Sequence, residues 1–433
     1  MSHNITRRQF LKNTALASSI MIIPRHVLGS GKYTAPSDKI QLGFIGTGRI
    51  SRSLQNRFLE SGQVNIVAAC DVHQTNLHFF LKRFHAYHYE QAGKTNASVA
   101  ECAAYKDFRE LLDRQDLDGV VISTPDHWHA IQAVRAAEAG KDIYCEKPLA
   151  LSIKEGRAMV QASQEHQRIF QTGSMQRSWH EFRHAVELVR NGYIGELQTI
   201  KVKVGGPPEP YDLPAEPVPK GLDWDFWLGP NPYFHYNRKL VPEPGDDFWA
   251  EWRYYQGLGG GYMMDWGTHM FDIAQWALDM DMSGPVKITP PNGEDYQYLT
   301  YQYENGLSMT HENFSNEFGN IVRFIGSEGI VDVARGHLET TPEHLKDVVI
   351  SENENRVYKS ENHYTDWLNA IRSRKDPICN AETGHRTATV CILGNLAYEL
   401  NRPLRWNPET EQFLADTEAN SMLMREQRKK WAL

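Results

Sequence analysis

A glycine-rich turn, Gly46-Thr47-Gly48, joins a strand-like stretch to a helix-like one. The residues before it, Ile40 to Ile45, are mostly apolar, and those after it, Ile50 to Ser61, carry apolar side chains at helical spacing. Glycine permits the tight turn and lets N–H groups at the start of a helix approach an anion. This unit predicts the opening of a doubly wound α/β sheet.

The same alternation continues to about residue 175. The expected strands lie at 40–45, 65–70, 119–123, 142–145 and 169–171. The expected helices lie at 50–61, 74–84, 129–139 and 154–166. Because helices of this length suit the crossovers that parallel strands need, residues 38–175 are predicted to form an N-terminal Rossmann domain.

Strand-like stretches dominate the next part of the chain. They lie at 199–204, 286–289, 296–303, 308–314, 320–325 and 329–333. We expect a C-terminal α/β domain over residues 176–405, with a large, open, mostly antiparallel sheet closed by helices at 364–373 and 382–400. Residues 406–433 are predicted to be a C-terminal extension. The proline- and aromatic-rich segment 205–257 is expected to be a binding loop over the active site.

The first 35 residues resemble a twin-arginine leader. Arg7-Arg8 precede Gln-Phe-Leu-Lys, and the apolar run from Ala15 to Ile23 is too short to span a bilayer. The expectation is export to the periplasm after folding around a cofactor, with cleavage between Gly29 and Ala35. Retention as an uncleaved membrane anchor, or a tail with a chance arginine pair, are the alternatives.

Charge and cysteine content narrow the class of partner. The formal net charge is -8 and the pI about 6.1, which argues against nucleic acid and anionic membranes as partners. A small-molecule ligand is the better expectation. The five cysteines form no CxxC or zinc spacing, so we interpret them as core thiols.

The first two strand ends predict a dinucleotide site. The turn and the helix start are expected to contact a pyrophosphate through Gly46, Gly48, Arg49 and Ile50. Asp71 ends the second strand, 23 residues beyond Gly48, where a carboxylate accepts hydrogen bonds from ribose hydroxyls. It would repel a 2′-phosphate, so the expected cofactor is NAD, with NADP the alternative. Ser51 replaces the usual third glycine and should loosen helix–strand packing slightly.

Two further strand ends point to the same edge of the sheet. Thr124, Pro125 and His129 follow one of them and are predicted cofactor contacts. The run from Asp126 to His129 has a metal-like pattern, but capping of the next helix explains it more simply, and no metal is expected. Glu146-Lys147-Pro148 follows the other strand, and Pro148 stiffens the turn that holds the Lys147 ammonium. Glu146 and Lys147 are predicted at the cofactor, with Lys147 as a proton-transfer partner.

A second constellation follows the glycines at 259–261. Asp265, His269 and Asp272 are spaced i, i+4 and i+7, which predicts one face of a helix. A neutral imidazole there suits removal of a hydroxyl proton while hydride leaves for a nicotinamide. Surface polarity with Asp265 as a cap, or a carboxylate–histidine metal face, are the alternatives.

Glu146-Lys147-Pro148 followed by Gly-Gly-Gly-Tyr-Met-Met-Asp-Trp-Gly-Thr-His-Met-Phe-Asp resembles the Gfo/Idh/MocA oxidoreductase family over about residues 39–405. The resemblance implies oxidation or reduction of a sugar or cyclitol, and an open sheet often used in homo-oligomer contacts. It assigns His269 as the base, Lys147 as a proton relay and Asp265 as the group that orients them.

Substrate contacts are predicted from two short clusters and one helix position. Gln176-Arg177 follow a strand, and Arg253-Tyr254 precede the glycines; planar donors and aromatic rings suit a sugar. Asp272 completes the predicted set.

Three functions remain open from the sequence. The first is an oxidoreductase that keeps its NAD and recycles it between two substrates, because little free cofactor is available outside the cytoplasm. The second is an NAD-dependent glycosidase that oxidises, eliminates, hydrates and re-reduces the sugar. The third is a sugar-binding or regulatory protein without turnover, which would usually lack Lys147 or His269.

Overall fold

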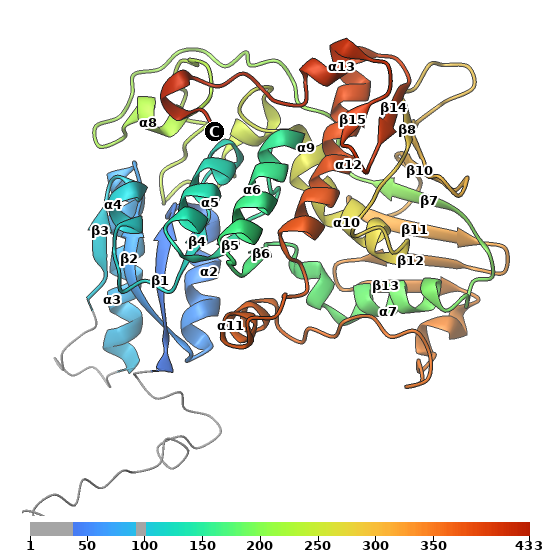
Figure 1. Ribbon diagram of the computed structural model, residues 1–433, viewed down its shortest axis with the longest axis horizontal. Helices are drawn as coiled ribbons and strands as arrows, with labels where there is room; N and C mark the ends of the chain where they lie inside the picture. The colour runs from blue at the N-terminus through green and yellow to red at the C-terminus, as the bar shows by residue number, and fades with distance from the viewer. Residues whose placement is uncertain (1–37, 92–100) are drawn as a thin grey trace, which may run out of the picture. The chain divides into compact units, whose positions relative to one another are not determined.

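The computed structural model describes residues 38–91 and 101–433, so the predicted leader lies outside the described part. Figure 1 shows two sheets in the described chain. The first runs through β1 (Ile40–Ile45), β2 (Val64–Cys70), β3 (Ala103–Tyr105), β4 (Gly119–Ile122), β5 (Asp142–Cys145) and β6 (Phe170–Thr172). Its order is β3-β2-β1-β4-β5-β6 and every recorded pairing is parallel. The doubly wound Rossmann sheet is therefore confirmed.

Helices cover both faces of this sheet. They are α2 (Arg49–Glu60), α3 (Gln74–Gln91), α4 (Phe108–Leu112), α5 (His129–Glu138) and α6 (Ile153–Glu165). Successive residues of β4 show the alternation: Val120 and Ile122 join one hydrophobic cluster with residues of α5 and α6, whereas Val121 joins a second cluster with residues of α2 and α3. Because both faces are buried, these strands are apolar throughout.

The second sheet is mostly antiparallel, as predicted. It contains β7 (Leu197–Lys203), β8 (Lys287–Thr289), β9 (Leu299–Gln302), β10 (Ser308–His311), β11 (Ile321–Gly326), β12 (Ile330–Ala334), β13 (His337–Thr341), β14 (Leu404–Asn407) and β15 (Gln412–Phe413). Its order is β13-β12-β11-β7-β10-β9-β8-β14-β15, and β7 with β10 is the parallel pair. The sequence missed β3, β13, β14 and β15, which are short or lie at sheet edges where alternation is weak.

Helices α7 (His180–Arg190), α10 (Gly267–Ala277) and α12 (Ala381–Leu400) pack beside this sheet. Helix α11 (His363–Ser373) differs, because its Trp367 and Leu368 join the cluster of α2, α3 and β1. Residues 417–421 form α13 and Trp431 is buried in the main core, so the predicted extension is packed against the fold.

One predicted helix is wrong. Asp265 and His269 were expected on one continuous helix, but α9 (Gly261–Asp265) ends at Asp265 and α10 begins at Gly267. Trp266 lies between them with helical backbone angles, and the Thr268 hydroxyl donates to the Met264 carbonyl across the junction at 2.8 Å. Gly261 has a φ of +72°, and a Cβ there would lie 2.4 Å from the Pro208 nitrogen. The close approach of residues 207–208 thus restricts the start of α9.

No helix within residues 38–91 and 101–433 is long and apolar enough to cross a bilayer. All five cysteines are in the described part and are free: Cys102 is half-buried, and the other four are buried. This placement agrees with their interpretation as core thiols.

Gly46 provides a test of the turn. Its φ is +88°, and a Cβ would lie 2.7 Å from the Ser123 carbonyl carbon and the Thr124 nitrogen. We expect Gly46→Ala to lower the free energy of unfolding by about 2 kcal/mol, measured by urea denaturation. Gly48→Ala is the matched control, because a Cβ there meets nothing within 4 Å. Equal stability of the two variants would contradict this account.

Candidate active site

A crevice opens where β1, β2 and β4 end, at the carboxyl edge of the parallel sheet. It contains about 1050 Å³ of space, part of which is open to solvent. The predicted cofactor residues on its wall are Gly46, Gly48, Arg49, Ile50, Asp71, Thr124 and Pro125. The structure brings these residues to one place, and their contact with a cofactor stays a prediction.

The start of α2 suits an anion. Gly48 precedes the helix without a side-chain cap, and the first turn contains no acidic residue. The N–H groups of a helix start have no partner within the helix and attract negative charge. A Cβ on Gly48 would enter open space, so ligand atoms can approach the backbone here. Ser51 is buried and its hydroxyl donates to the Gly48 carbonyl at 2.7 Å, and the predicted loosening of the packing stays a prediction.

Asp71 is held at the crevice wall by three hydrogen bonds. Its Oδ2 accepts from the Thr47 nitrogen at 2.7 Å and the Thr47 hydroxyl at 2.8 Å, and its Oδ1 accepts from the His73 nitrogen at 2.8 Å. A carboxylate can accept further bonds at both oxygens. The orientation therefore leaves Asp71 able to accept ribose hydroxyls, as the sequence predicts.

The aromatic segment 205–257 supplies the opposite wall of the crevice. Its lining residues include Phe226, Trp227, Leu240, Val241, Pro242, Phe248, Trp249 and Trp252. Arg49 fastens the segment, because its Nη1 donates to the Phe248 carbonyl at 2.9 Å and its guanidinium lies 4.7 Å from the Trp249 ring centre. The segment thus covers the crevice, and we call it the cover segment.

Lys147 and Asp265 form an ion pair between the two domains. The Lys147 Nζ donates to Asp265 Oδ1 at 2.8 Å and to the Asp265 carbonyl at 2.7 Å. Arg253 Nε lies 3.6 Å from the same Oδ1, and all three side chains are mostly but not fully buried. Although burial opposes ionisation, Lys147 and Arg253 lower the pKa of Asp265. Asp265 is therefore a carboxylate that holds the ammonium in place.

His269 lies in the first turn of α10, beside this pair. Its ring is buried, and within the described chain its Nδ1 has no hydrogen-bond partner. Burial lowers the pKa of His269 well below its usual value, and the positive charges of Lys147 and Arg335 lower it further. The ring is neutral at physiological pH, and a buried polar atom without a partner is the kind of group that a bound ligand satisfies.

Two buried carboxyl groups flank the ion pair. Burial raises the pKa of Asp126 to about 8 and that of Glu146 to about 7. Lys147 and Arg253 oppose this shift in both cases without overcoming it. Asp126 is therefore mostly protonated at neutral pH, while Glu146 is close to half ionised. Glu146 is not on the crevice wall, and its predicted cofactor contact is untested.

Ring nitrogens of His127 and His129 are hydrogen-bonded to backbone carbonyl groups. His127 Nε2 lies 2.8 Å from the Trp227 oxygen, and the ring nitrogens of His129 lie 2.8 Å and 3.0 Å from the oxygens of Pro148 and Thr124. No group of three or more His, Cys, Asp or Glu residues in the described ranges could hold a metal ion. His129 lies behind the crevice wall, where it supports the turns that carry Thr124 and Lys147.

The predicted substrate residues differ in burial: Arg177, Asp272 and Gln176 are buried, whereas Tyr254 is half-buried. Arg177 is fully buried and binds Asp272 with three hydrogen bonds of 2.9 to 3.0 Å, so this pair is committed to the interior of the protein. Gln176 is also buried, with its Nε2 3.4 Å from the His269 carbonyl. Tyr254 is half-buried and stacks on Tyr262, with ring centres 4.9 Å apart. Substrate contact by these residues stays a prediction.

Arg335 is a residue that the sequence reasoning missed. It follows β12, its Nε donates to Gln176 Oε1 at 3.0 Å, and it contributes to lowering the pKa of His269. An arginine before a glycine in a strand-to-strand turn carries no functional signal by itself. Only the fold brings it close to His269.

Comparison with known proteins supports this organisation. Residues 40–174 match the pattern "oxidoreductase family, NAD-binding Rossmann fold", and residues 208–433 match "oxidoreductase family, C-terminal alpha/beta domain" of Gfo/Idh/MocA. Among solved structures, an aldose-aldose oxidoreductase from Caulobacter crescentus is 20% identical with a TM-score of 0.57. That match covers 85% of this chain and 99% of the other, and shows the shared fold.

Two curated relatives match part of the chain. A 2,7-anhydro-N-acetylneuraminate hydratase from Mediterraneibacter gnavus is 31% identical over 153 residues, covering 35% of this chain and 36% of the relative. A glycosyl hydrolase family 109 protein from Shewanella sp. (strain MR-4) is 30% identical over 215 residues, or 45% of each chain. The chain thus spans less than half the length of either relative. Through its two domain matches, the chain belongs to the Gfo/Idh/MocA oxidoreductase family and has its NAD-binding Rossmann domain.

Proposed function

We propose that this protein is a nicotinamide-dependent oxidoreductase that acts on a CH–OH group of a sugar, a sugar derivative or a cyclitol and keeps its NAD through the catalytic cycle. The observation that carries the proposal is the Lys147–Asp265 ion pair beside the neutral His269. This group lies next to a crevice whose uncapped helix, open Gly48 and Asp71 suit a dinucleotide.

The residues divide the work of alcohol oxidation. A bound nicotinamide group would supply the hydride acceptor. Neutral His269 is suited to take the hydroxyl proton, because burial and the nearby positive charges keep its ring unprotonated at physiological pH. Lys147 is positioned to hydrogen-bond the same oxygen and to stabilise charge that develops on it. Asp265 fixes the ammonium through its carboxylate and its carbonyl.

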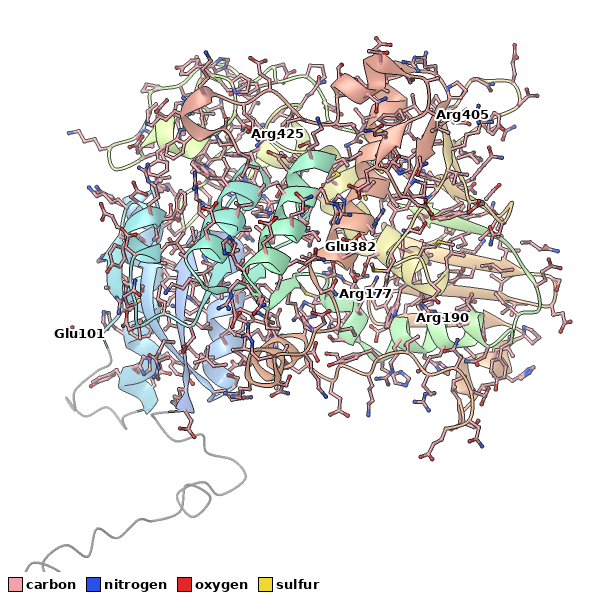
Figure 2. All side chains as sticks on the ribbon, in the orientation of Figure 1. Glu101, Arg177, Arg190, Glu382, Arg405 and Arg425 are labelled. Atoms are coloured by element: carbon pink, nitrogen blue, oxygen red, sulfur yellow. The ribbon has the colours of Figure 1, made fainter. Side chains whose placement is uncertain are left out.

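The cover segment supports retention of the cofactor. It forms one wall of the crevice, and the C-terminal tail fixes it from behind: the Trp431 ring stacks on Phe226 at 4.9 Å and meets Trp128 edge-on at 4.9 Å. The C-terminus lies beside α8 (Trp224–Leu228), as Figure 1 shows. Arg425, labelled in Figure 2, donates to Glu155 of α6 at 2.7 Å.

Retention of NAD would matter most if the protein acts outside the cytoplasm. If the twin-arginine leader exports the folded protein to the periplasm, or anchors it at the membrane, the bound NAD must be regenerated on the enzyme. A second substrate with a carbonyl group would then accept the hydride. Asp71 favours NAD over NADP because a carboxylate repels a 2′-phosphate. We further propose a homo-oligomer that uses the open sheet, as the sequence resemblance implies.

A redox-neutral glycosidase is the second candidate, favoured by relatives named as a glycosyl hydrolase and a hydratase. In that reaction, oxidation at a ring carbon acidifies the neighbouring C–H, elimination and hydration follow, and re-reduction restores the sugar. His269 and Lys147 serve either route. A non-catalytic sugar-binding protein is the least supported, because both residues are present and lie close together.

Lys147→Met tests the proposed function. We expect a loss of at least about 100-fold in kcat, because the proton relay and charge stabilisation are removed, with NAD occupancy unchanged. Occupancy is measured by mass spectrometry of the nucleotide released on denaturation, and turnover with a panel of sugars and glycosides. Lys154→Met, an exposed lysine on α6, is the control. Undiminished turnover by the Lys147 variant would remove its assigned role. Net oxidation that requires an acceptor indicates the oxidoreductase, and hydrolysis without net redox change the glycosidase.

Trp431→Ala tests retention. Loss of the ring behind Phe226 should loosen the cover segment and speed NAD release at least about tenfold, measured by dilution into excess labelled NAD. Trp406→Ala is the control: it removes a buried tryptophan that packs on Phe413 in the second sheet. Both variants should lose about 3 kcal/mol of stability. If both release NAD at the same rate, the tail has no specific part in retention.

Asp126→Asn tests whether the raised pKa of Asp126 makes the stability of the protein depend on pH. Because the pKa of Asp126 rises from 3.8 to about 8 on folding, the folded protein holds a proton that the unfolded chain releases. Wild-type stability should therefore be greatest below pH 4 for this group and fall as the pH rises to 8. The variant should lose less stability between pH 5 and pH 8, by on the order of a few kcal/mol, in urea denaturation. Exposed Asp347→Asn should keep the wild-type slope.

A further inference from the structure

Arg335 extends from the turn between β12 and β13 to the active-site residues of the other elements. Its guanidinium lies 4.4 Å from the ring centre of Trp266 and 5.3 Å from that of Trp179. Its Nε donates to Gln176 Oε1 at 3.0 Å, and Gln176 Nε2 reaches the His269 carbonyl at 3.4 Å. The side chain is therefore held in one orientation close to His269.

The rest of the guanidinium remains available. Arg335 is exposed to solvent, and across residues 38–91 and 101–433 its terminal nitrogens make neither a hydrogen bond nor an ion pair. Arginines that serve only packing usually have their charge matched by a carboxylate, as Arg177 is by Asp272 and Asp281. A planar fork that is fixed at Nε and free at its two ends is suited to bidentate binding of an oxyanion.

Arg335 has no ion-pair partner among the described charged groups around the site. Burial lowers its pKa, and Asp265 and Glu146 oppose that larger effect from farther away. Lys147 and Arg253 share Asp265 at 2.8 Å and 3.6 Å, whereas Arg335 has no carboxylate within ion-pair distance in the described structure. Among the other groups that face this region, Asp126 and Glu146 are buried in the neutral or half-ionised state, and His269 and His363 are neutral. Positive charge therefore exceeds negative charge where a substrate would enter.

We propose that Arg335 binds an oxyanion on the substrate, so that this protein acts on acidic sugars, with a carboxylate as the expected group. This inference rests on the proposed function, because it concerns the substrate of the same site. The carboxylate would occupy the two free ends of the guanidinium, while the sugar ring lies toward His269 and Lys147. The aromatic rings of Trp179 and Trp266 hold the guanidinium plane in place.

The experiment compares matched sugars on the NAD-loaded protein. Each pair consists of a neutral sugar and its acidic form: glucose with glucuronate, galactose with galacturonate, and N-acetylglucosamine with its 6-sulfate. Binding is measured by calorimetry and turnover by product analysis, for the wild type, Arg335→Gln and Arg335→Lys. Arg405→Gln is the control, an exposed arginine at the far end of the second sheet (Figure 2).

We expect the wild type to bind a carboxylate sugar at least about 30-fold more tightly than its neutral partner. Arg335→Gln should remove that preference and change neutral sugar binding by less than about threefold, and Arg335→Lys should restore part of it. Thermal stability is measured for both variants, because a packing role alone would lower stability without changing the ratio of acidic to neutral sugar binding. A preference for the sulfate over the carboxylates would keep the oxyanion site and replace its expected ligand.

Equal binding of both members of every pair, or an acidic preference that survives in Arg335→Gln, would overturn the inference. The proposed function fails in a different way: acidic sugars bind through Arg335, but no sugar is oxidised, reduced or hydrolysed. Turnover of neutral sugars alone would support the function and contradict the oxyanion site.

Discussion

The ion pair between Lys147 and Asp265 joins residues of the two domains in one candidate site. Lys147 follows the last residues of β5, and Asp265 ends α9, 118 residues later in the chain. Because Nζ bonds both the carboxylate and the carbonyl of Asp265, it fixes the end of α9 as well as its side chain. Helix α10 starts from that point, so the position of His269 depends on this contact.

Much of the fold followed from local pattern. Apolar strands that alternate with helices of crossover length specify a parallel sheet, and the carboxyl ends of its strands specify where Gly46, Asp71 and Thr124 gather. The break between α9 and α10 was not predictable in this way. Periodicity places Asp265 and His269 on one face of a single helix. The structure instead ends α9 at Asp265 and begins α10 at Gly267, with the Thr268 hydroxyl bonded to the Met264 carbonyl across the junction.

Contacts between distant segments account for the other differences. Arg335 reaches Gln176 across 159 residues, and Arg428 reaches Asp225 across 203. Neither arginine differs in sequence from a surface charge. Residues that follow the strand ends of the parallel sheet can thus be predicted from a single sequence. Residues in the turns of the second sheet or in the C-terminal tail cannot, because only the folded second domain brings them to the site.

Burial determines which cations of the site are paired with a carboxylate. Removing a cation from water is costly unless it is paired, and the cost is small at an exposed edge. Lys147 and Arg253 are mostly buried and share Asp265, which fixes the geometry that the proposed proton transfer would use. Arg335 keeps contact with solvent, although partial burial lowers its pKa, and it forms no ion pair in the described chain. The unpaired charge of Arg335 therefore lies where the proposed oxyanion could replace water. The paired charges of Lys147, Arg253 and Asp265 lie in the interior, where their geometry is fixed.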